Sequence, residues 1–355
     1  MTTDKNIYIP SLDGIRAVAA LLVFFAHVGL RVGLNLAPGG FGVTIFFFLS
    51  GYLITTLLRL ERERTGAISL RHFYLRRAYR IFPPMYLVLC LNLTLAFAGI
   101  APSNLTAGAV IAQFAHFSNY YMLWSGTSHI VPGTGALWSL AVEEHFYLLY
   151  PLMLSLLLRR TTYRQTAIAL LGLCAVVLAW RCYRVFDLGL HGDYTYEATD
   201  CRFDSLLYGC IMGIALNPAL DRNILDFGKR VWLVALTASG AVLLFCFVFR
   251  DESFRETFRY TLQGVALFPI FFCAIRHKDW PLFAWLNNNW VRRLGVISYT
   301  FYLIHLTTLS QAADLVHYNL LLTPLLGFVF AVAFSTIVYF LIERPLSRLR
   351  HKLHR

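Results

Sequence analysis

Long apolar stretches alternate with short polar segments along the whole chain. Many of these stretches hold about 20 residues, the length that a helix needs to cross the hydrocarbon core of a bilayer. The pattern predicts an all-α, polytopic transmembrane helical bundle that forms a single domain over residues 1–355. Its ten predicted spans lie near residues 12–32, 41–59, 82–100, 137–158, 164–184, 202–217, 231–249, 258–275, 294–315 and 321–342.

A further apolar stretch, residues 105–123, is ambiguous. Short cytoplasmic loops collect Lys and Arg, so the distribution of positive charge tests whether this stretch spans. If it does not span, 23 of the 31 Lys and Arg residues fall on one side of the membrane. We therefore expect ten spans with both termini in the cytoplasm, and a re-entrant or interfacial segment at 105–123.

Composition agrees with a membrane protein, because 58% of the residues are hydrophobic and only 14% are charged. The formal net charge is +12, but the basic residues lie between the apolar stretches and form no motif for nucleic acid. The seven Cys are scattered and show no metal-ligand spacing. We therefore expect no nucleic-acid partner and no metal site.

Arg16 and His27 are ionisable residues within the first predicted span. Their spacing of eleven residues, at about 100° each, places both on one helix face about 16 Å apart along the axis. An intramembrane Arg is costly, so both side chains are expected to face a cavity inside the bundle. His27 is then a candidate general base in the outer half of the membrane. A snorkelling anchor for Arg16 and a hydrogen bond between helices for His27 stay open.

The span near 137–158 opens with a polar cluster that includes Ser139, Glu143 and Glu144. Ser139 and Glu143 are i and i+4 neighbours and share a face, so we expect Glu143 rather than Glu144 to point into the bundle. At the depth of His27, this carboxylate could orient the imidazole and favour its charged form. A structural hydrogen bond between helices is the alternative.

Arg77 and Arg80 precede the predicted span near 82–100 on its cytoplasmic side. Their i and i+3 spacing lets the two planar guanidinium groups converge on one phosphate. A role in topology or in binding lipid headgroups explains the spacing equally well.

Two more polar clusters lie at the ends of predicted spans or inside them. Arg202 and Asp204 stand at the outer start of the span near 202–217, where they could bind substrate or pair with each other. In the same span Gly209 and Gly213 form a G-x-x-x-G motif, which indicates close helix packing. His305, with Tyr302 three residues earlier, lies in the span near 294–315 as a substrate contact or a core hydrogen-bonder.

Signatures of soluble enzymes such as G-x-S-x-G, the P-loop and G-x-G-x-x-G are missing from the sequence. Several long motifs, in order over nearly the whole chain, instead resemble those of the membrane acyltransferase 3 family. They are R-x10-H at Arg16 and His27, F-F-x-L-S-G-Y-L at 46–53, R-x-x-R at Arg77 and Arg80, W-S-L-x-x-E-E-x-F-Y-L-L-x-P at 138–151, R-x-D at Arg202 and Asp204, and S-Y-x-x-Y-L-x-H at 298–305.

The resemblance implies an O-acyltransferase in a cell membrane, expected to be a bacterial inner membrane. Its donor would be a cytoplasmic acyl-CoA, with acetyl as the commonest acyl group in the family, and acyl-CoA would act as a co-substrate rather than a tightly bound cofactor. Its acceptor would be a hydroxyl of a carbohydrate or glycolipid. Some relatives carry a C-terminal hydrolase-like domain, which we do not expect here because the chain ends soon after the last predicted span.

The expected mechanism places these residues along one path through the membrane. Arg77 and Arg80 would bind the CoA phosphates, and the pantetheine arm would pass Arg16 and bring the thioester to His27. His27 would take the proton of the acceptor hydroxyl, with Glu143 acting on its ring. Ser139 would support Glu143, while the acceptor side would be lined by Arg202, Asp204, Tyr302 and His305. A covalent acyl-histidine, a transporter or flippase of a glycolipid or acyl-bearing substrate, and a homo-oligomer all stay open.

Overall fold

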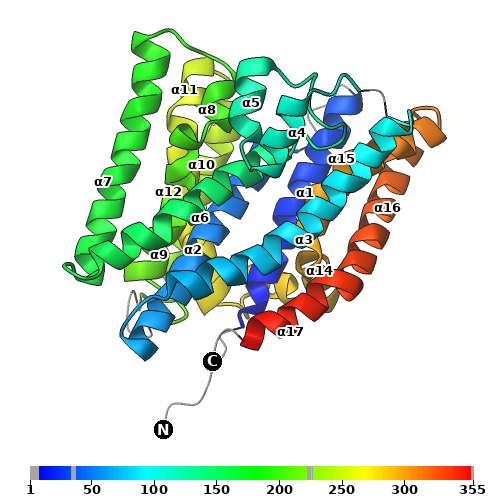
Figure 1. Cartoon of the computed structure of the whole chain (residues 1–355). Helices are drawn as coiled ribbons and strands as arrows, with labels where there is room; N and C mark the ends of the chain where they lie inside the picture. The colour runs from blue at the N-terminus through cyan, green and yellow to red at the C-terminus, as the bar shows by residue number, and fades with distance from the viewer. Residues whose placement is uncertain (1–7, 33–36, 102, 222–224, 226, 353–355) are drawn as a thin grey trace.

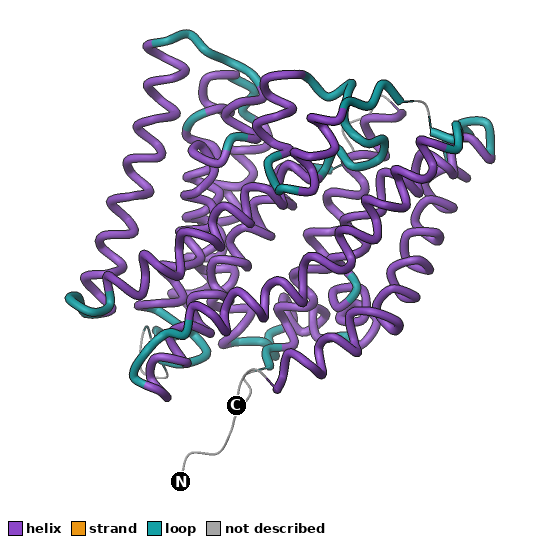
Figure 2. The backbone as a smooth tube through the Cα atoms, viewed as in Figure 1, coloured by secondary structure: helices purple, strands orange, loops and turns teal. Residues whose placement is uncertain are grey.

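The computed structural model describes residues 8–32, 37–101, 103–221, 225 and 227–352. In this part of the chain all regular secondary structure is helical (Figure 2), which confirms the all-α fold class. The long helices are α1 (Pro10–Val32), α2 (Gly39–Thr65), α3 (Leu70–Phe97), α6 (Leu137–Leu157), α7 (Tyr163–Cys182), α9 (Thr199–Ala215), α10 (Lys229–Val248), α12 (Phe258–Arg276), α15 (Ser298–Leu315) and α16 (Leu322–Val338).

Short helices connect or extend the long ones. They are α4 (Ala107–Phe114), α5 (Ser118–Ser125), α8 (Asp193–Glu197), α11 (Glu252–Glu256), α13 (Pro281–Ala284), α14 (Asn289–Val296) and α17 (Arg344–Lys352), with turns of other helix types at η1 (Tyr183–Asp187), η2 (Trp285–Asn287) and η3 (Tyr339–Glu343). Figure 1 shows α4, α5, α8 and α11 at one end of the bundle and α14 and α17 at the other.

Eight helices of the described chain are long and apolar enough to cross a membrane, so this is a multi-pass membrane protein. The two predicted spans outside this set correspond to α9, which has 17 residues, and to α15, which is rich in polar side chains. Both are central helices whose side chains are mostly buried. Because neighbouring helices shield them from lipid, they can carry polar groups that a lipid-facing helix could not.

Peripheral helices show the opposite pattern. α7, α10 and α16 bury only a minor share of their apolar residues and expose many Leu, Val and Ile side chains. Lipid tails solvate such side chains as well as a protein interior does, so an apolar surface of this kind fits a bilayer. The exposed apolar side chains therefore distinguish the outer, lipid-facing helices from the polar helices at the centre of the bundle.

Helices α2 and α9 pack closely against each other in the centre of the bundle. A Cβ added to Gly209 would lie 1.9 Å from the carbonyl oxygen of Phe48, and one added to Gly51 would lie 2.0 Å from that of Leu206. Only glycine permits this approach, since any side chain would collide with backbone. The expected role of the G-x-x-x-G motif in helix packing is confirmed.

Residues 105–123 form the two short helices α4 and α5 instead of one long helix. The break falls at His116, whose φ of 57° lies in the left-handed region that interrupts a helix. Each helix has eight residues and rises about 12 Å, far less than the thickness of the hydrocarbon core. The span predicted near 294–315 is also divided, between the last turn of α14 and α15.

Candidate active site

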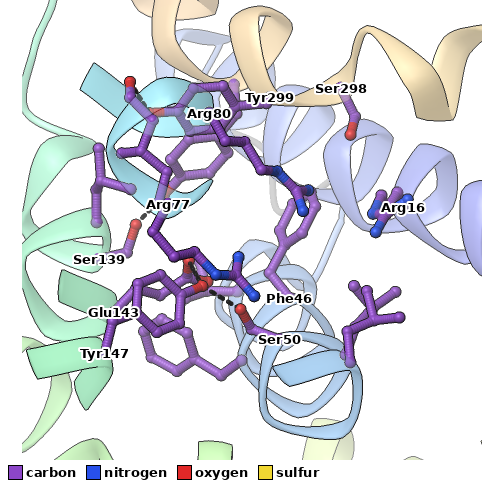
Figure 3. A pocket seen from close by; sticks show the side chains of 17 residues that line it. Arg16, Phe46, Ser50, Arg77, Arg80, Ser139, Glu143, Tyr147, Ser298 and Tyr299 are labelled. Atoms are coloured by element: carbon purple, nitrogen blue, oxygen red, sulfur yellow. Dashed lines mark hydrogen bonds between the residues drawn. The ribbon is translucent and has the colours of Figure 1, made fainter. Parts of the chain in front are cut away.

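A cavity rich in arginine lies between the central helices, with walls from α1, α2, α3, α6 and α15 (Figure 3). We call it the arginine cavity, and it encloses about 740 Å³ of empty space including its mouth. Its lining consists of Arg16, Val43, Phe46, Phe47, Leu49, Ser50, Leu53, Arg77, Arg80, Ile81, Ser139, Leu140, Glu143, Tyr147, Ser298, Tyr299 and Tyr302. Such a chamber, mostly apolar with a few convergent polar groups, is typical of a ligand site.

Arg77 and Arg80 both direct their guanidinium groups into this cavity (Figure 3). Their i and i+3 spacing on α3 puts them on one face of that helix. Arg77 lies 4.7 Å from the ring centroid of Tyr147, an arrangement that holds its flat group in place. Within the described residues, neither Arg77 nor Arg80 forms an ion pair with a carboxylate, so both retain capacity to bind an anion.

The neighbouring arginines differ in this respect. Arg16 lines the same cavity but is paired with Asp13 one turn earlier on α1, while Arg76 is paired with Glu61 of α2 at 2.8 Å. Arg76 thus holds two helices together. Arg77 and Arg80 thus differ from Arg16 and Arg76, each of which has a carboxylate partner.

Glu143 is the carboxylate of the arginine cavity, and it points inward as its spacing from Ser139 predicts. The hydroxyl of Tyr147, one turn along α6, donates to Glu143 at 2.6 Å. Ser50 of α2 is hydrogen-bonded to the same hydroxyl. Because that hydroxyl already donates to the carboxylate, Ser50 must be the donor to Tyr147. The chain from Ser50 through Tyr147 to Glu143 ties α2 to α6 beside Arg77.

His27 lines a second, adjoining cavity, which we call the histidine cavity. Val43 and Tyr302 belong to the walls of both cavities, so these two side chains stand between the arginine groups and His27. The lining of the histidine cavity consists of Val23, Ala26, His27, Leu30, Ala37, Gly39, Gly40, Val43, Gly135, Ala136, Trp138, Tyr196, Glu197, Tyr302 and Leu306. The two cavities together link Arg16 and His27 along α1.

The hydrogen bonds of His27 determine which ring nitrogen carries its proton. Nδ1 of His27 lies 2.9 Å from the carbonyl oxygen of Val23, and a carbonyl can only accept, so Nδ1 is protonated in the neutral ring. Nδ1 of His305 likewise donates to the carbonyl of Tyr302, at 2.6 Å. Nε2 of His305 is therefore an acceptor, and it lies 3.2 Å from Nδ1 of His27. Nε2 of His27 keeps a lone pair for the cavity.

This arrangement differs from the expected pair of Glu143 and His27. In the described chain, His27 has its hydrogen bonds with Val23 and His305, whereas Glu143 bonds to Tyr147. Glu143 lies one turn further along α6 than Ser139 and opens into the arginine cavity. The groups that hold the imidazole are thus the carbonyl of Val23 and, sharing the same N–H, His305 of α15.

Ser139 occupies the boundary between the two cavities. Its hydroxyl lies 2.6 Å from the hydroxyl of Tyr302 and also donates to the carbonyl of Ala136 at 3.0 Å. Its bonding partner from another helix is therefore Tyr302 rather than the expected Glu143. Since Tyr302 lines both cavities, Ser139 fixes a side chain that separates the arginine groups from His27.

Arg202 and Asp204 do not pair with each other. Asp204 instead accepts from both terminal nitrogens of Arg181 on α7, at 2.9 and 2.6 Å, and both side chains are fully buried. Arg202 lies 4.1 Å from the ring centroid of Tyr260 and donates to the hydroxyl of Thr44. The interpretation of Arg202 and Asp204 as an ion pair is wrong, because Arg181 reaches the carboxylate from a different helix.

Sequence reasoning also missed several polar residues of the two cavities. Tyr147 and Ser50 lie inside the motifs quoted above, and their tight hydrogen bond requires the packing of α2 against α6. Glu197 of α8 lines the histidine cavity, and burial, with Asp193 nearby, raises its pKa to about 7. Its signal in the sequence is only a carboxylate among aromatic residues near a span, which is too weak to single it out.

A small acidic cluster lies at the same end of the bundle as α8. His191, Glu252 and Glu256 bring their ligand atoms within 4.8 Å of one another, a grouping that their spacing did not indicate. Glu256 accepts from the backbone N–H of Gly192, and its other oxygen lies 3.3 Å from His191. These contacts of Glu256 hold the loop before α8 against α11.

Several known proteins that share sequence with this chain are named as O-acetyltransferases. The chain is 30% identical to the peptidoglycan O-acetyltransferase OatA of Listeria monocytogenes, over 84% of this chain and 49% of that protein. It is 32% identical to the O-acetyltransferase OatA of Staphylococcus aureus, over 84% and 50%. The putative peptidoglycan O-acetyltransferase YrhL of Bacillus subtilis is 30% identical, over 97% and 56%. The chain spans about half the length of the curated relatives it matches.

No solved structure matches the chain. A family model described as an acyltransferase domain matches residues 9–344 and so includes α1 to α16, which form both cavities. This range also contains each of the motifs from Arg16 to His305. The chain therefore belongs to the membrane acyltransferase 3 family.

Proposed function

We propose that this protein is a membrane O-acyltransferase that moves an acyl group, with acetyl the expected one, from cytoplasmic acyl-CoA to a hydroxyl of a carbohydrate or glycolipid. The observation that carries the proposal is the junction of two cavities at Val43 and Tyr302. One cavity offers cationic groups for a phosphorylated donor, and the other offers an imidazole nitrogen with a lone pair. Relatives named as O-acetyltransferases support the same chemistry.

Arg77 and Arg80 are the proposed contacts for the CoA phosphates. Their guanidinium groups share one cavity wall and are not neutralised by an ion pair in the described structure. Planar guanidinium groups bind phosphate oxygens through two parallel hydrogen bonds. Arg16 lies further along the same cavity, where it would contact the pantetheine arm on its way to Tyr302.

His27 is the proposed general base. Its Nε2 takes the proton of the acceptor hydroxyl while the hydroxyl oxygen attacks the thioester carbonyl. The bond between carbon and sulfur then breaks, and CoA leaves as a thiolate that recovers the proton from the imidazolium. His305 supports this step because its Nε2 accepts from Nδ1 of His27 and fixes the ring orientation. The ring is thereby held in an orientation that can take the proton of the acceptor hydroxyl.

The remaining site residues have proposed positioning roles. Glu143, with Tyr147, lies where the thioester would enter from the arginine cavity and balances part of the positive charge there. Ser139 holds Tyr302 between the two cavities. Arg202 and Asp204 line neither cavity, so their proposed role is to hold α9 against α2 and α7.

The proposed acceptor is a glycan at the bacterial cell surface, in the class that the names of the relatives indicate. A flippase for a glycolipid is the rival function, since it too would use buried charge along a path through the membrane. The enzyme is favoured by the free imidazole nitrogen of His27, because moving a glycolipid across the membrane requires no proton acceptor.

Acyl transfer can be measured with acetyl-CoA labelled in the acetyl group, added to membranes that contain the full chain. Loss of the general base should lower transfer into extractable glycan or lipid by about 100-fold or more in His27→Gln, with CoA binding unchanged. Transfer at the wild-type rate would rule out His27 as the base. Movement of unmodified glycolipid without any label transfer would favour the flippase.

A further inference from the structure

A third hollow lies beside the histidine cavity and contains three arginine side chains. Arg250 follows α10, Arg255 belongs to α11, and Arg259 lies in the first turn of α12. We call it the triple-arginine cleft. The opposite wall is the start of α2, and the full lining consists of Ala37, Pro38, Gly39, Gly40, Phe41, Cys246, Phe247, Arg250, Arg255, Arg259, Tyr260 and Gln263.

The position of these arginines is unusual for a membrane protein. Figure 1 shows α11 at the end of the bundle opposite α17, which is the side that the charge distribution assigns to the exterior. Positive residues are depleted from short exterior loops, because cytoplasmic loops retain them. Three arginines gathered in one exterior hollow therefore need a reason other than topology.

No carboxylate neutralises the three side chains. In the part of the chain that the structure describes, Arg250, Arg255 and Arg259 form no ion pair, and Nε of Arg259 is buried without a hydrogen-bond partner. Two nearby acids are engaged elsewhere: Asp251 accepts from the backbone N–H of Phe254, and Glu256 accepts from that of Gly192. Glu252 acts on Arg255 through its charge but forms no ion pair with it in the described structure.

Mutual repulsion is the expected result of this arrangement. Burial and the positive charges of Arg259 and Arg250 lower the pKa of Arg255. An anion between the three guanidinium groups would remove that repulsion and supply the partner that Nε of Arg259 lacks. The cleft thus has an excess of positive charge, which an anionic ligand could neutralise.

The cleft also adjoins the candidate active site. Ala37, Gly39 and Gly40 line both the triple-arginine cleft and the histidine cavity. A ligand with its anionic group in the cleft would therefore extend along the start of α2 toward His27. Phe41 and Phe247, whose ring centroids are 5.3 Å apart, add an apolar surface to the wall.

We propose that the triple-arginine cleft binds a phosphate ester at the exterior face of the protein. Arginine forks match the paired oxygens of a phosphate, and three of them favour a phosphate, which has more acceptor oxygens than a single carboxylate. The phosphate can belong to a phosphorylated saccharide or to a phospholipid headgroup. Only the further step, that this phosphate belongs to the acyl acceptor, rests on the proposed function.

Binding can be tested with the full chain in nanodiscs of phosphatidylcholine, which is neutral overall. The probe is N-acetylglucosamine 1-phosphate, with unphosphorylated N-acetylglucosamine as its matched control. Both are added with excess CoA, and again in an Arg77→Gln background, so that the arginine cavity does not contribute. The phosphorylated sugar should bind at least tenfold more tightly than the neutral sugar.

Three variants test which arginines bind the sugar phosphate. Arg255→Gln with Arg259→Gln should weaken binding of the sugar phosphate by tenfold or more. Arg250→Gln changes an exposed side chain and should weaken binding several-fold without affecting thermal stability. Arg31→Gln removes an exterior arginine that lines a different hollow and should leave binding unchanged. Equal affinity in wild type and in all cleft variants would overturn the proposal.

A last comparison identifies the source of the phosphate. Phosphatidylglycerol in the nanodiscs should leave binding of the sugar phosphate intact if the natural ligand is a saccharide, and should compete with it if the ligand is a headgroup. Acetyl transfer to a neutral acceptor is measured in parallel. Retained transfer with no phosphate binding would refute the proposed phosphate site and leave the proposed function standing. Wild-type transfer in His27→Gln would instead refute the proposed function and would not bear on the phosphate site.

Discussion

At the scale of single residues, arginine side chains with and without a carboxylate partner lie close together on α3. Arg77 and Arg80 open into the arginine cavity, Arg76 is bound to Glu61, and Arg71 is exposed near the start of the helix. The same residue type therefore has three different surroundings within ten positions. Only the unpaired guanidinium groups inside the cavity are suited to a phosphate.

Replacement of these residues provides a matched test of the donor site. Arg77→Gln and Arg80→Gln should each weaken CoA binding by about tenfold or more, because a charged hydrogen bond contributes about 1.5–3 kcal/mol. Arg71→Gln, on the same helix but outside the cavity, is the control and should bind CoA as wild type does. Binding is measured by calorimetry in detergent. Equal affinities in all three variants would show that the pair serves topology.

Glu197 gives a prediction for pH dependence. Its pKa is about 7 in the folded protein and close to the ordinary value of a Glu carboxyl, 4.5, in an unfolded chain. As pH rises through this window the unfolded state ionises first, so the folded state loses stability. Glu197→Gln removes this effect and should be more stable than wild type by about 1–2 kcal/mol above pH 7, after allowance for solvent screening.

Thermal unfolding at several pH values checks this prediction. At pH 4 both states hold a protonated Glu197, so variant and wild type should unfold at similar temperatures. The difference should grow between pH 5 and pH 7 and then stay constant. A difference that does not change with pH would show that Glu197 ionises normally.

At the scale of helices, the buried pair of Arg181 and Asp204 joins α7 to α9. Both side chains are fully buried, so loss of one partner leaves an uncompensated charge inside the bundle. Asp204→Leu should lower the free energy of unfolding by about 3–5 kcal/mol, and Arg181→Met should do the same. The double variant should recover most of the loss, since it leaves no buried charge behind.

Unfolding in detergent measures these energies. The double variant should also retain acyl transfer if the pair acts only by holding α9 in place. A double variant that folds well but loses all transfer would instead show that the pair contributes to the site. Arg202 belongs to the same region, but its contacts include Tyr260, Thr44 and the backbone carbonyl of Tyr196.

At the scale of the whole molecule, the two cavities and the distribution of positive charge together predict a direction for the reaction. The loops rich in Lys and Arg lie on the side expected to face the cytoplasm, and the histidine cavity reaches α8 at the other end. Acetyl-CoA cannot cross a membrane unaided, so the donor must enter from one side only.

Sealed vesicles of known orientation test this direction. Labelled acetyl-CoA added to inside-out vesicles should label glycan or lipid, while sealed right-side-out vesicles should stay unlabelled until they are permeabilised. The difference should be at least tenfold and should disappear in detergent. Equal labelling of both sealed preparations would contradict a cytoplasmic donor site.

Much of the architecture follows from the sequence, because hydrophobic length and positive charge act locally. A run of about 20 apolar residues specifies a helix in lipid whatever its neighbours are, and so the all-α membrane bundle was predictable. The spacing of Arg77 and Arg80, and of Ser139 and Glu143, likewise fixed shared helix faces before any packing was known.

Contacts between helices required the tertiary structure. The sequence placed Arg16, His27 and Glu143 in the bundle, but it could not show that Arg181 would reach Asp204 or that His305 would hold His27. Residues in each of these pairs are separated by at least 23 positions and lie on different helices. Helical periodicity determines which side of one helix faces inward, whereas the partner that meets it depends on how all the helices pack.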